Sequence, residues 1–378
     1  MSIRQHNLGS IVKPGFNPLG AQTSVTTYQP YLYSWGLNDS GQLGLSDTTN
    51  RSSPNQVGSL TNWLNISTGY SSSLATKTDG TLWSWGKNNF GQLALGNTTN
   101  YSSPKQVGAL TSWLNVSVAR DACLATKTDG TLWSWGYNSN GQLGLSNYTN
   151  YSSPKQVGTL TNWSKIVSSN SFSVATKTDG TLWAWGQNSS GQLGINNTTD
   201  QNSPRQVGSL TTWLNIGAAQ GSTFAVKTDG TIWSWGAGNI GVLGLGNTTY
   251  YSSPKQIGAL TTWSNVTAGS IFAAAIKTDG SLWAWGNNSS GQLGQNNTTD
   301  RSSPVQVGSL LIWSSVTCNS NGVLSITTAG ALWSWGKNDT GQLGLGNTTY
   351  ISSPMQVGSL TTWLKVAGGR NTTIALLY

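Results

Sequence analysis

The side chains that most often carry out catalysis are scarce in this sequence. Histidine occurs once, at His6, glutamate does not occur, and the two cysteines, Cys123 and Cys318, stand at different positions of a repeat. These residues provide no Cys-His or Ser-His pair, no cluster with metal-ligand spacing and no glycine-rich phosphate loop before a helix. We therefore predict no catalytic residue, no cofactor and no metal, and we interpret the chain as a binding or structural protein rather than an enzyme.

Aspartate is the only acidic residue, and five of its eleven copies have a structural explanation because they stand in Thr-Asp-Gly turns. These five are Asp79, Asp129, Asp179, Asp229 and Asp279. Paired-carboxylate chemistry needs two carboxylates within several ångströms of each other. Asp121 alone is individually placed, and we expect it to be solvated or salt-bridged rather than catalytic.

The elements that must position these residues recur every 50 residues. The clearest marker is a Trp-Ser/Ala-Trp-Gly motif, which the first copy replaces with Tyr-Ser-Trp-Gly. The tryptophans that precede the glycine are Trp35, Trp85, Trp135, Trp185, Trp235, Trp285 and Trp335. A fixed period of this length is typical of repeat architectures. We predict an extended arm over residues 1–28 and one domain over residues 29–378. Its periods are 29–78, 79–128, 129–178, 179–228, 229–278, 279–328 and 329–378.

One period contains four strand-like segments and no helical pattern. In the second copy of the motif, residues 73–77 and 81–85 flank Asp79-Gly80, a strong hairpin signal, and residues 104–107 and 113–116 lie between turns rich in Gly, Ser and Thr. Four strands per 50 residues, repeated seven times, predict an all-β fold, a single seven-bladed β-propeller.

The two ends of the chain are predicted to close the ring. Residues 374–378 match residues 74–78 but have no following partner, whereas residues 31–35 match residues 81–85 and have no preceding one. We expect these N-terminal and C-terminal strands to pair in one blade, because closure removes exposed sheet edges.

The run Trp-Gly-x-Asn-x-x-Gly-Gln-Leu-Gly, with Pro and Gln-Val about ten to twelve residues later, resembles the regulator of chromosome condensation repeat. The resemblance implies a seven-bladed propeller, often used for protein or nucleic-acid binding. Proteins similar in fold include a nucleotide-exchange factor, a plant ultraviolet-B photoreceptor and a secreted inhibitor of β-lactamases, so the fold alone does not fix the function. The family's usual Gly-x-x-His-Thr histidine is missing from all seven copies, which argues against exchange activity, and the photoreceptor's Trp/Arg clusters are missing too.

Self-comparison of the seven copies shows one variable segment, the five residues before the Leu/Val-Ala strand. The resemblance places this segment near the central channel, and we predict a partner-binding site there. Its candidate residues are Arg120, Asp121, Asn170, Phe172, Gln220, Ile271, Phe272, Asn319 and Arg370. The alternative explanation is drift at unconstrained loop positions.

The net charge is +8, yet charged residues make up only 8% of the chain. The lysines beside the Thr-Asp-Gly turns are balanced by the aspartates. An uncompensated arc on four consecutive blades consists of Lys105, Lys155, Arg205 and Lys255. This arc predicts contact with an anionic glycan or an acidic protein surface, or else a solvated face, and we do not expect nucleic acid to be the main partner.

The arm combines prolines with apolar residues that could anchor it on a neighbouring protein: Ile11, Val12, Phe16 and Leu19. No signal peptide or membrane span is evident. A leaderless arm before a neutral Asn/Ser/Thr/Gly-rich repeat domain is similar to bacteriophage virion appendages. We therefore predict a virion protein, anchored through its arm to other virion proteins and presenting a loop face to a host or neighbouring subunit. The alternative is a soluble, cytoplasmic regulatory or inhibitory protein-binding module.

Overall fold

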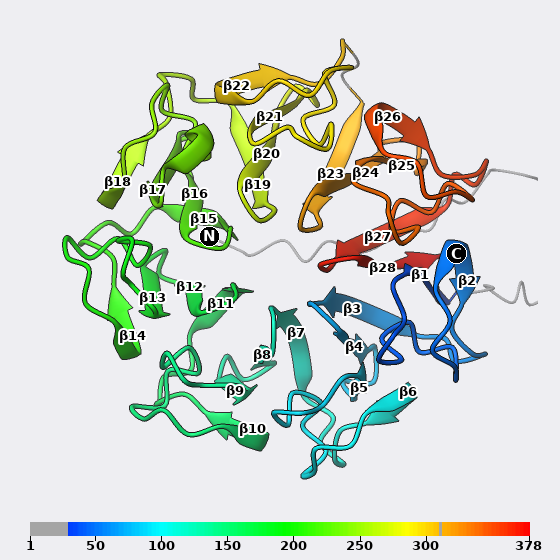
Figure 1. Cartoon of the computed structure of the whole chain (residues 1–378). Helices are drawn as coiled ribbons and strands as arrows, with labels where there is room; N and C mark the ends of the chain where they lie inside the picture. Colours follow the sequence, from blue (N-terminus) through cyan, green and yellow to red (C-terminus); the bar gives the residue numbers. More distant parts are fainter. Residues whose placement is uncertain (1–28, 310–311) are drawn as a thin grey trace, which may run out of the picture.

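The computed structural model describes residues 29–309 and 312–378, which form a ring of seven four-stranded antiparallel sheets around a central channel (Figure 1). We number the blades in chain order: blades 1 to 6 hold β3–β6, β7–β10, β11–β14, β15–β18, β19–β22 and β23–β26, and blade 7 holds β27, β28, β1 and β2. The single seven-bladed propeller predicted from the repeat is therefore confirmed.

Each blade has the same four strands from the channel outward. The inner strands are β3 (Trp63–Thr68), β7 (Trp113–Val118), β11 (Trp163–Ser168), β15 (Trp213–Ala218), β19 (Trp263–Ala268), β23 (Trp313–Cys318) and β27 (Trp363–Gly368). The second strands are β4 (Ser72–Lys77), β8 (Ala122–Lys127), β12 (Phe172–Lys177), β16 (Ser222–Lys227), β20 (Phe272–Lys277), β24 (Gly322–Thr327) and β28 (Thr372–Leu377). The third strands are β5 (Leu82–Gly86), β9 (Leu132–Gly136), β13 (Leu182–Gly186), β17 (Ile232–Gly236), β21 (Leu282–Gly286), β25 (Leu332–Gly336) and β1 (Tyr31–Gly36). The outer strands are β6 (Tyr101–Gln106), β10 (Tyr151–Gln156), β14 (Gln201–Gln206), β18 (Tyr251–Gln256), β22 (Arg301–Gln306), β26 (Ile351–Gln356) and β2 (Arg51–Gln56).

Blade 7 closes the ring with strands from both ends of the chain. β1 pairs antiparallel with β28 over their full length, from Tyr31 opposite Leu377 to Gly36 opposite Thr372. In Figure 1 the blue β1 lies beside the red β28. The predicted closure is therefore confirmed, and neither strand is left with an exposed edge.

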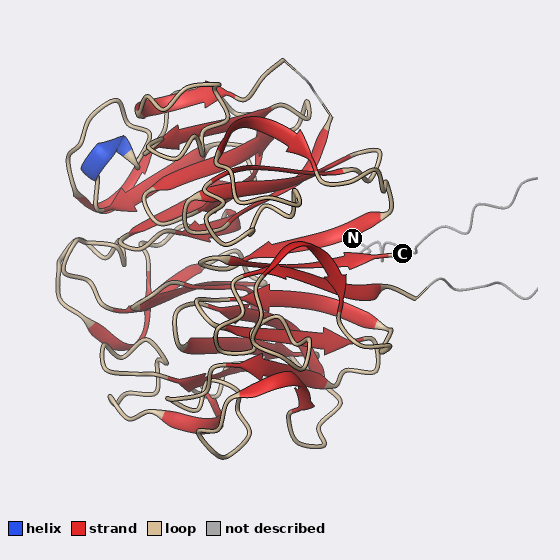
Figure 2. Ribbon diagram, turned by 45° about the vertical axis from the view of Figure 1, so that its right-hand side comes forward, coloured by secondary structure: helices blue, strands red, loops and turns tan. Residues whose placement is uncertain are grey.

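The strands run between two faces of the ring (Figure 2). One face, which we call the tip face, carries the hairpins between inner and second strands, such as residues 69–72. The other, the turn face, carries the Thr-Asp-Gly turns. The described chain begins at Gln29 and ends at Tyr378, both on the turn face, because Tyr31 pairs with Leu377 at the turn-face end of β28.

Tryptophans join each blade to the one before it. The indole N–H of Trp85 donates to the main-chain carbonyl of Gln42 in blade 7, at 2.9 Å, and Trp85 is fully buried. The equivalent bond recurs at every blade junction, made by Trp35, Trp135, Trp185, Trp235, Trp285 and Trp335. Within its own blade, Trp85 also packs edge-on against the tryptophan that begins the inner strand, Trp63. The repeated tryptophan therefore holds neighbouring blades together.

The Thr-Asp-Gly turn is held by its own side chains. The carboxylate of Asp79 accepts hydrogen bonds from the amide and the hydroxyl of Thr81, at 2.9 and 2.7 Å. Gly80 has a φ of +77°, and a Cβ there would lie 2.0 Å from the carbonyl oxygen of Thr111, so no other residue fits. The neighbouring Lys77 is buried with its ammonium 4.9 Å from the rings of both Trp63 and Trp83. The lysine therefore packs on indole faces rather than in an ion pair with the aspartate.

Two local details differ from the sequence prediction. The outer strand β6 begins at Tyr101, three residues before the expected 104, because a bulge lets Tyr101 pair with Gly86 while Lys105 pairs with Ser84. Blade 4 also has a 3₁₀ turn, η1 (Asn239–Gly241). It occurs where Gly238 replaces an asparagine whose side chain, as at Asn88, braces the loop by accepting from the Leu93 amide.

Candidate partner-binding site

Seven side chains, one from each hairpin tip, surround the mouth of the channel on the tip face. Each hairpin has a two-residue tip, because the amide of the residue before it donates to the carbonyl three positions later, as from Gly69 to Ser72. We call the first tip residue of each blade a member of the tip ring. The tip ring consists of Tyr70, Arg120, Asn170, Gln220, Ser270, Ser320 and Arg370.

Main-chain hydrogen bonds hold neighbouring tips in place. The amide of Tyr70 donates to the Ala119 carbonyl, at 3.3 Å, and the amide of Arg370 donates to the Gly69 carbonyl, at 3.0 Å. The tips of blades 4, 5 and 6 are linked to the next blade in the same way. Different side chains are thus presented on a shared, fixed backbone frame.

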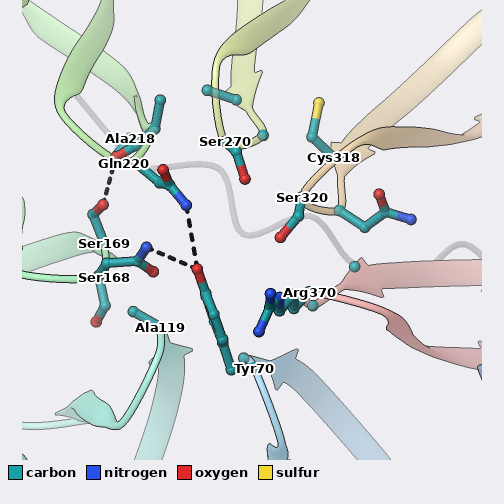
Figure 3. Close-up of a pocket in the computed structure, with 18 of the residues that line it drawn as sticks. Tyr70, Ala119, Ser168, Ser169, Ala218, Gln220, Ser270, Cys318, Ser320 and Arg370 are labelled. Carbon is teal, nitrogen blue, oxygen red and sulfur yellow. Dashed lines mark hydrogen bonds between the residues drawn. The ribbon is translucent and has the colours of Figure 1, made fainter. Parts of the chain in front are cut away.

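Tyr70 is the hub of the tip ring. Its hydroxyl oxygen accepts hydrogen bonds from the side-chain amides of Asn170, at 3.0 Å, and Gln220, at 3.2 Å. Figure 3 shows the tyrosine ring reaching across the mouth toward Gln220. These bonds connect blade 1 with blades 3 and 4, which lie 100 and 150 residues away in the sequence.

Two arginines flank Tyr70 from the neighbouring blades. The guanidinium carbon of Arg370 lies 4.8 Å from the centre of the Tyr70 ring, and that of Arg120 lies 5.8 Å from it. Arg120 also faces the Asp121 carboxylate at 3.5 Å, with 62% of its side chain exposed. Cation–π contact therefore orders both arginines around one aromatic ring while leaving the N–H groups of Arg370 available.

The tip ring encloses a cavity that opens at the mouth. Its volume is about 110 Å³, and its walls include Tyr70, Asn170, Gln220 and Arg370 together with small residues of the inner strands. Below it, a chamber of about 290 Å³ is lined by residues of all seven inner strands, such as Ile66 and Ile216. At the turn-face end of the channel, the Lys365 ammonium donates to Asn65 Oδ1 and to the Leu64 carbonyl, both at 2.7 Å.

The predicted site residues separate into two groups. Arg120, Asn170, Gln220 and Arg370 come together at the mouth. Phe172 and Phe272 are fully buried and pack between blades, Asn319 is buried with its Oδ1 accepting from the Asn321 amide, and Ile271 is only half-buried. The two phenylalanines begin second strands and face the protein interior, whereas Asn319 lines the cavity at the mouth.

Asp121 is also buried and is held by the scaffold. Its Oδ1 accepts a hydrogen bond from the side-chain amide of Gln92, at 3.0 Å. Burial raises the pKa of this carboxyl, and the positive charges of Lys87 and Arg120 oppose that shift. The adjacent Cys123 thiol has a pKa raised well above its ordinary value by burial, and burial likewise raises that of Cys318. In the folded state these thiols are protonated at neutral pH.

The basic arc lies elsewhere, on the outer strands of blades 1 to 4. All four side chains are exposed. The ammonium groups of Lys105, Lys155 and Lys255 lie 5.5 to 5.6 Å from the ring of the tyrosine that begins the same strand. Arg205 instead donates from Nε to Gln201, at 3.0 Å. The arc is therefore a surface on the rim of the ring, separate from the channel mouth.

Sequence reasoning missed three members of the tip ring: Tyr70, Ser270 and Ser320. All three lie within the variable segments or at their edge, but the chemistry of their side chains did not mark them as binding residues. The available signal was position, because the tip residue recurs every 50 residues and is the one that faces the channel axis.

Other functional expectations can be examined only in the described part of the chain. Within residues 29–309 and 312–378, no three His, Cys, Asp or Glu side chains group closely enough to hold a metal ion. No helix in these ranges is long and apolar enough to cross a membrane. The anchoring residues Ile11, Val12, Phe16 and Leu19 lie outside the described residues.

The fold places this protein in the class of β-propellers. Its antiparallel sheets form a closed ring, and variable hairpin tips surround the axis on a fixed scaffold. Residues 20–314 match the profile of the RCC1-like domain, which is most of the chain, so this protein belongs to that family. Residues 329–376 match the regulator of chromosome condensation (RCC1) repeat. The family resemblance noted from the Gly-Gln-Leu-Gly motif is thus confirmed.

Solved structures show the same fold at low sequence identity. Human WBSCR16 is 20% identical, with a TM-score of 0.82, and the match covers 93% of this chain and 99% of that one. Prp20p of Saccharomyces cerevisiae, described with its binding to Gsp1p and histones, is 18% identical, with a TM-score of 0.82, over 93% of this chain and 92% of that one. Yeast RCC1 (Prp20) bound to Kap60 gives the same identity and TM-score over 100% of this chain and 96% of that one. No curated protein matches the chain.

Two of these structures are described with partners, and the comparisons also bear on the virion prediction. The structural relatives with stated partners bind other proteins. None of the similar proteins is described as part of a virion, so the comparisons give no support to the virion prediction.

Proposed function

We propose that this protein is a non-enzymatic regulatory or inhibitory module that captures a protein partner on its tip face, with the tip ring at the centre of the contact. The observation that carries the proposal is the contrast between frame and tips. The seven blades repeat the same Trp bond, whereas the seven tip positions hold tyrosine, two arginines, two amides and two serines.

The composition of the tip ring suits recognition of a protein. Tyrosine and arginine are enriched among residues that dominate binding energy at protein interfaces, and amides and serines supply adaptable hydrogen bonds. Tyr70 and the two arginines are already ordered by contact with one another, which lowers the entropic cost of binding.

We do not carry the virion reading into this proposal. Its evidence was the layout of an arm, whose residues 1–28 lie outside the described residues, before an Asn/Ser/Thr/Gly-rich repeat domain, and the comparisons favour the regulatory alternative. Attachment through Ile11, Val12, Phe16 and Leu19 stays a prediction.

The test compares two variants of the full-length protein in affinity purification from its source cells, with bound proteins quantified by mass spectrometry. The first carries Tyr70→Ser, Gln220→Ser and Arg370→Ser, because serine already occupies the tip in blades 5 and 6. The matched control carries Lys105→Gln, Lys155→Gln and Lys255→Gln on the basic arc. We expect the tip variant to lose a partner that the arc variant retains. Loss from the arc variant alone would contradict the proposal.

A further inference from the structure

At the channel mouth, hydrogen-bond donors lack acceptors and a positive charge lacks a counter-ion within the described residues. Arg370 lines the cavity, and no ion pair or side-chain hydrogen bond of its guanidinium is formed within residues 29–309 and 312–378. Its guanidinium carbon lies 4.8 Å from the centre of the Tyr70 ring, and this cation–π contact does not use its N–H groups as hydrogen-bond donors. Figure 3 shows its side chain directed toward the same open space as the Ser270 and Ser320 hydroxyls.

The Tyr70 hydroxyl is restricted to donation. Its oxygen already accepts two hydrogen bonds, from Asn170 and Gln220. A phenol has one hydrogen to donate, and within the described part of the chain that hydrogen has no acceptor. The two amides thus orient the tyrosine so that its O–H serves as a donor at the centre of the mouth.

The acidic side chain nearest to the tip ring does not neutralise the mouth. Asp121 is buried, and its carboxylate faces Gln92 and the exposed Arg120 rather than the cavity. Asp121 does not line the cavity, and neither does any other acidic residue of the described ranges. A ligand for this site must therefore bring both acceptor atoms and negative charge.

We propose that the mouth is a receptor for the carboxylate of an acidic side chain on the protein partner, and this inference rests on the function proposed above. Arg370 supplies the cation and the paired N–H groups that match a carboxylate. The hydroxyls of Tyr70, Ser270 and Ser320 supply further donors, and Arg120 adds positive charge at the rim. The cavity of about 110 Å³ is far larger than the ~15 Å³ that one water needs, so it accommodates the head of an acidic side chain.

The experiment uses the arginines as their own reporters. The chain has six, at Arg4, Arg51, Arg120, Arg205, Arg301 and Arg370, so the Nε–Hε signals of the ¹⁵N-labelled full-length protein form a small, assignable set. The probes are an N-acetylated, C-amidated Gly-Glu-Gly peptide, its Gly-Gln-Gly counterpart and inorganic phosphate, each at constant ionic strength. We expect the glutamate peptide to shift the Arg370 signal in a saturable way, with Arg51, Arg205 and Arg301 unchanged and no effect from the glutamine peptide.

Two variants establish the site. Arg370→Gln should weaken binding of the glutamate peptide at least about tenfold, as expected for loss of a charged hydrogen bond. Binding is then followed at Arg120 in that variant. Arg205→Gln removes the same charge from the outer strand β14 and should leave the affinity unchanged.

Several results would overturn the inference. These are equal shifts at all arginines, binding of the glutamine peptide with the same affinity, saturable binding of phosphate without any of the peptide, or no shift at all. The purification described above separates this failure from failure of the proposed function. If the tip variant loses its partner but the glutamate peptide does not shift the Arg370 signal, the proposed partner-binding face is supported and the proposed carboxylate site is contradicted. If the peptide binds but the tip variant keeps its partner, the proposed function falls.

Discussion

The indole N–H of Trp85 donates to the carbonyl of Gln42 across the junction between blades 1 and 7, and that carbonyl also accepts from the Ser73 hydroxyl at 2.9 Å. One buried acceptor therefore ties the third and second strands of one blade to the loop of its neighbour. The tryptophan bond recurs at every junction, and the second-strand bond recurs in blades 2, 3, 4 and 7.

Trp85→Phe should lower the free energy of unfolding by about 2 kcal/mol, because it removes this bond and leaves unfilled space in a close-packed junction. Trp83→Phe is the matched control: that indole is only partly buried and donates to Thr81 within its own turn. We expect the control to cost clearly less in urea unfolding followed by circular dichroism. Equal losses would show that the inter-blade bond is not what distinguishes the two positions.

The Thr-Asp-Gly turns predict loss of stability in acid. Hydrogen bonds from the Thr81 and Thr131 hydroxyls and amides lower the pKa of Asp79 and Asp129 below the ordinary value of 3.8. The unfolded chain then takes up protons at a higher pH than the folded one. The stabilisation is therefore full above about pH 4 and is lost as the pH falls through the folded pKa.

The double variant Asp79→Asn and Asp129→Asn keeps acceptor oxygens in both turns but cannot titrate. Urea unfolding of both proteins between pH 2 and 6 should show a smaller drop in stability for the variant than for the unchanged protein. Parallel curves would contradict this role of the turn carboxylates.

Asp121 is expected to have the opposite effect on how stability depends on pH. Burial raises the pKa of this carboxyl, so the folded state disfavours the ionised form and the group costs stability as the pH rises above its ordinary titration range. Asp121→Asn retains an acceptor for Gln92 and should be at least as stable as the unchanged protein at pH 7. Asp121→Ala leaves the buried Gln92 amide without that acceptor and should cost about 1–3 kcal/mol.

Thermal unfolding of both variants at pH 7 and pH 4 tests this. If Asp121→Asn were as damaging as Asp121→Ala at pH 7, the contact between Asp121 and Arg120, and not the acceptor for Gln92, would be what the protein needs.

The junction between blades 6 and 7 can be strengthened. Between blades 6 and 7, Tyr33 stands where other blades have tryptophan, and a largely apolar cavity of about 490 Å³ adjoins it, with Trp363 and Met355 in its wall. Tyr33→Trp should fill part of that space and raise the free energy of unfolding by about 1 kcal/mol. Trp83→Tyr, the reverse change in blade 1, serves as the control and should destabilise. A stability decrease for Tyr33→Trp in urea would mean that the junction cannot admit the larger ring.

The fold was predictable because the same physical problem is solved seven times. A Trp-x-Trp pair on one strand, an Asp-Gly turn and a fixed period leave a closed ring as the arrangement that buries every blade face, and the unmatched ends at Tyr31 and Leu377 show where it closes. The start of the outer strand at Tyr101 was not predicted. A bulge shifts the strand register there, and the residues around it show no alternation of apolar and polar side chains that would indicate a strand.

The candidate site was only partly predictable. Variability marked the segment that holds the tip ring, yet it did not separate tip positions from core positions two residues later. Phe172 looks like a recognition residue in the sequence but is fully buried, because the second strand is covered on both faces and all of its residues are buried. Tyr70 looks unremarkable until the ring brings Asn170 and Gln220 to its hydroxyl from 100 and 150 residues away.

The claim that the tip face receives the partner is tested most directly by site-specific photo-crosslinking in the source cells. A photoreactive phenylalanine is placed at Ser270, in the tip ring, or at Leu110, which is 52% exposed on the turn face. We predict a discrete crosslinked protein from position 270 that position 110 does not yield. A crosslink to that protein from position 110, with none from position 270, would contradict the claim.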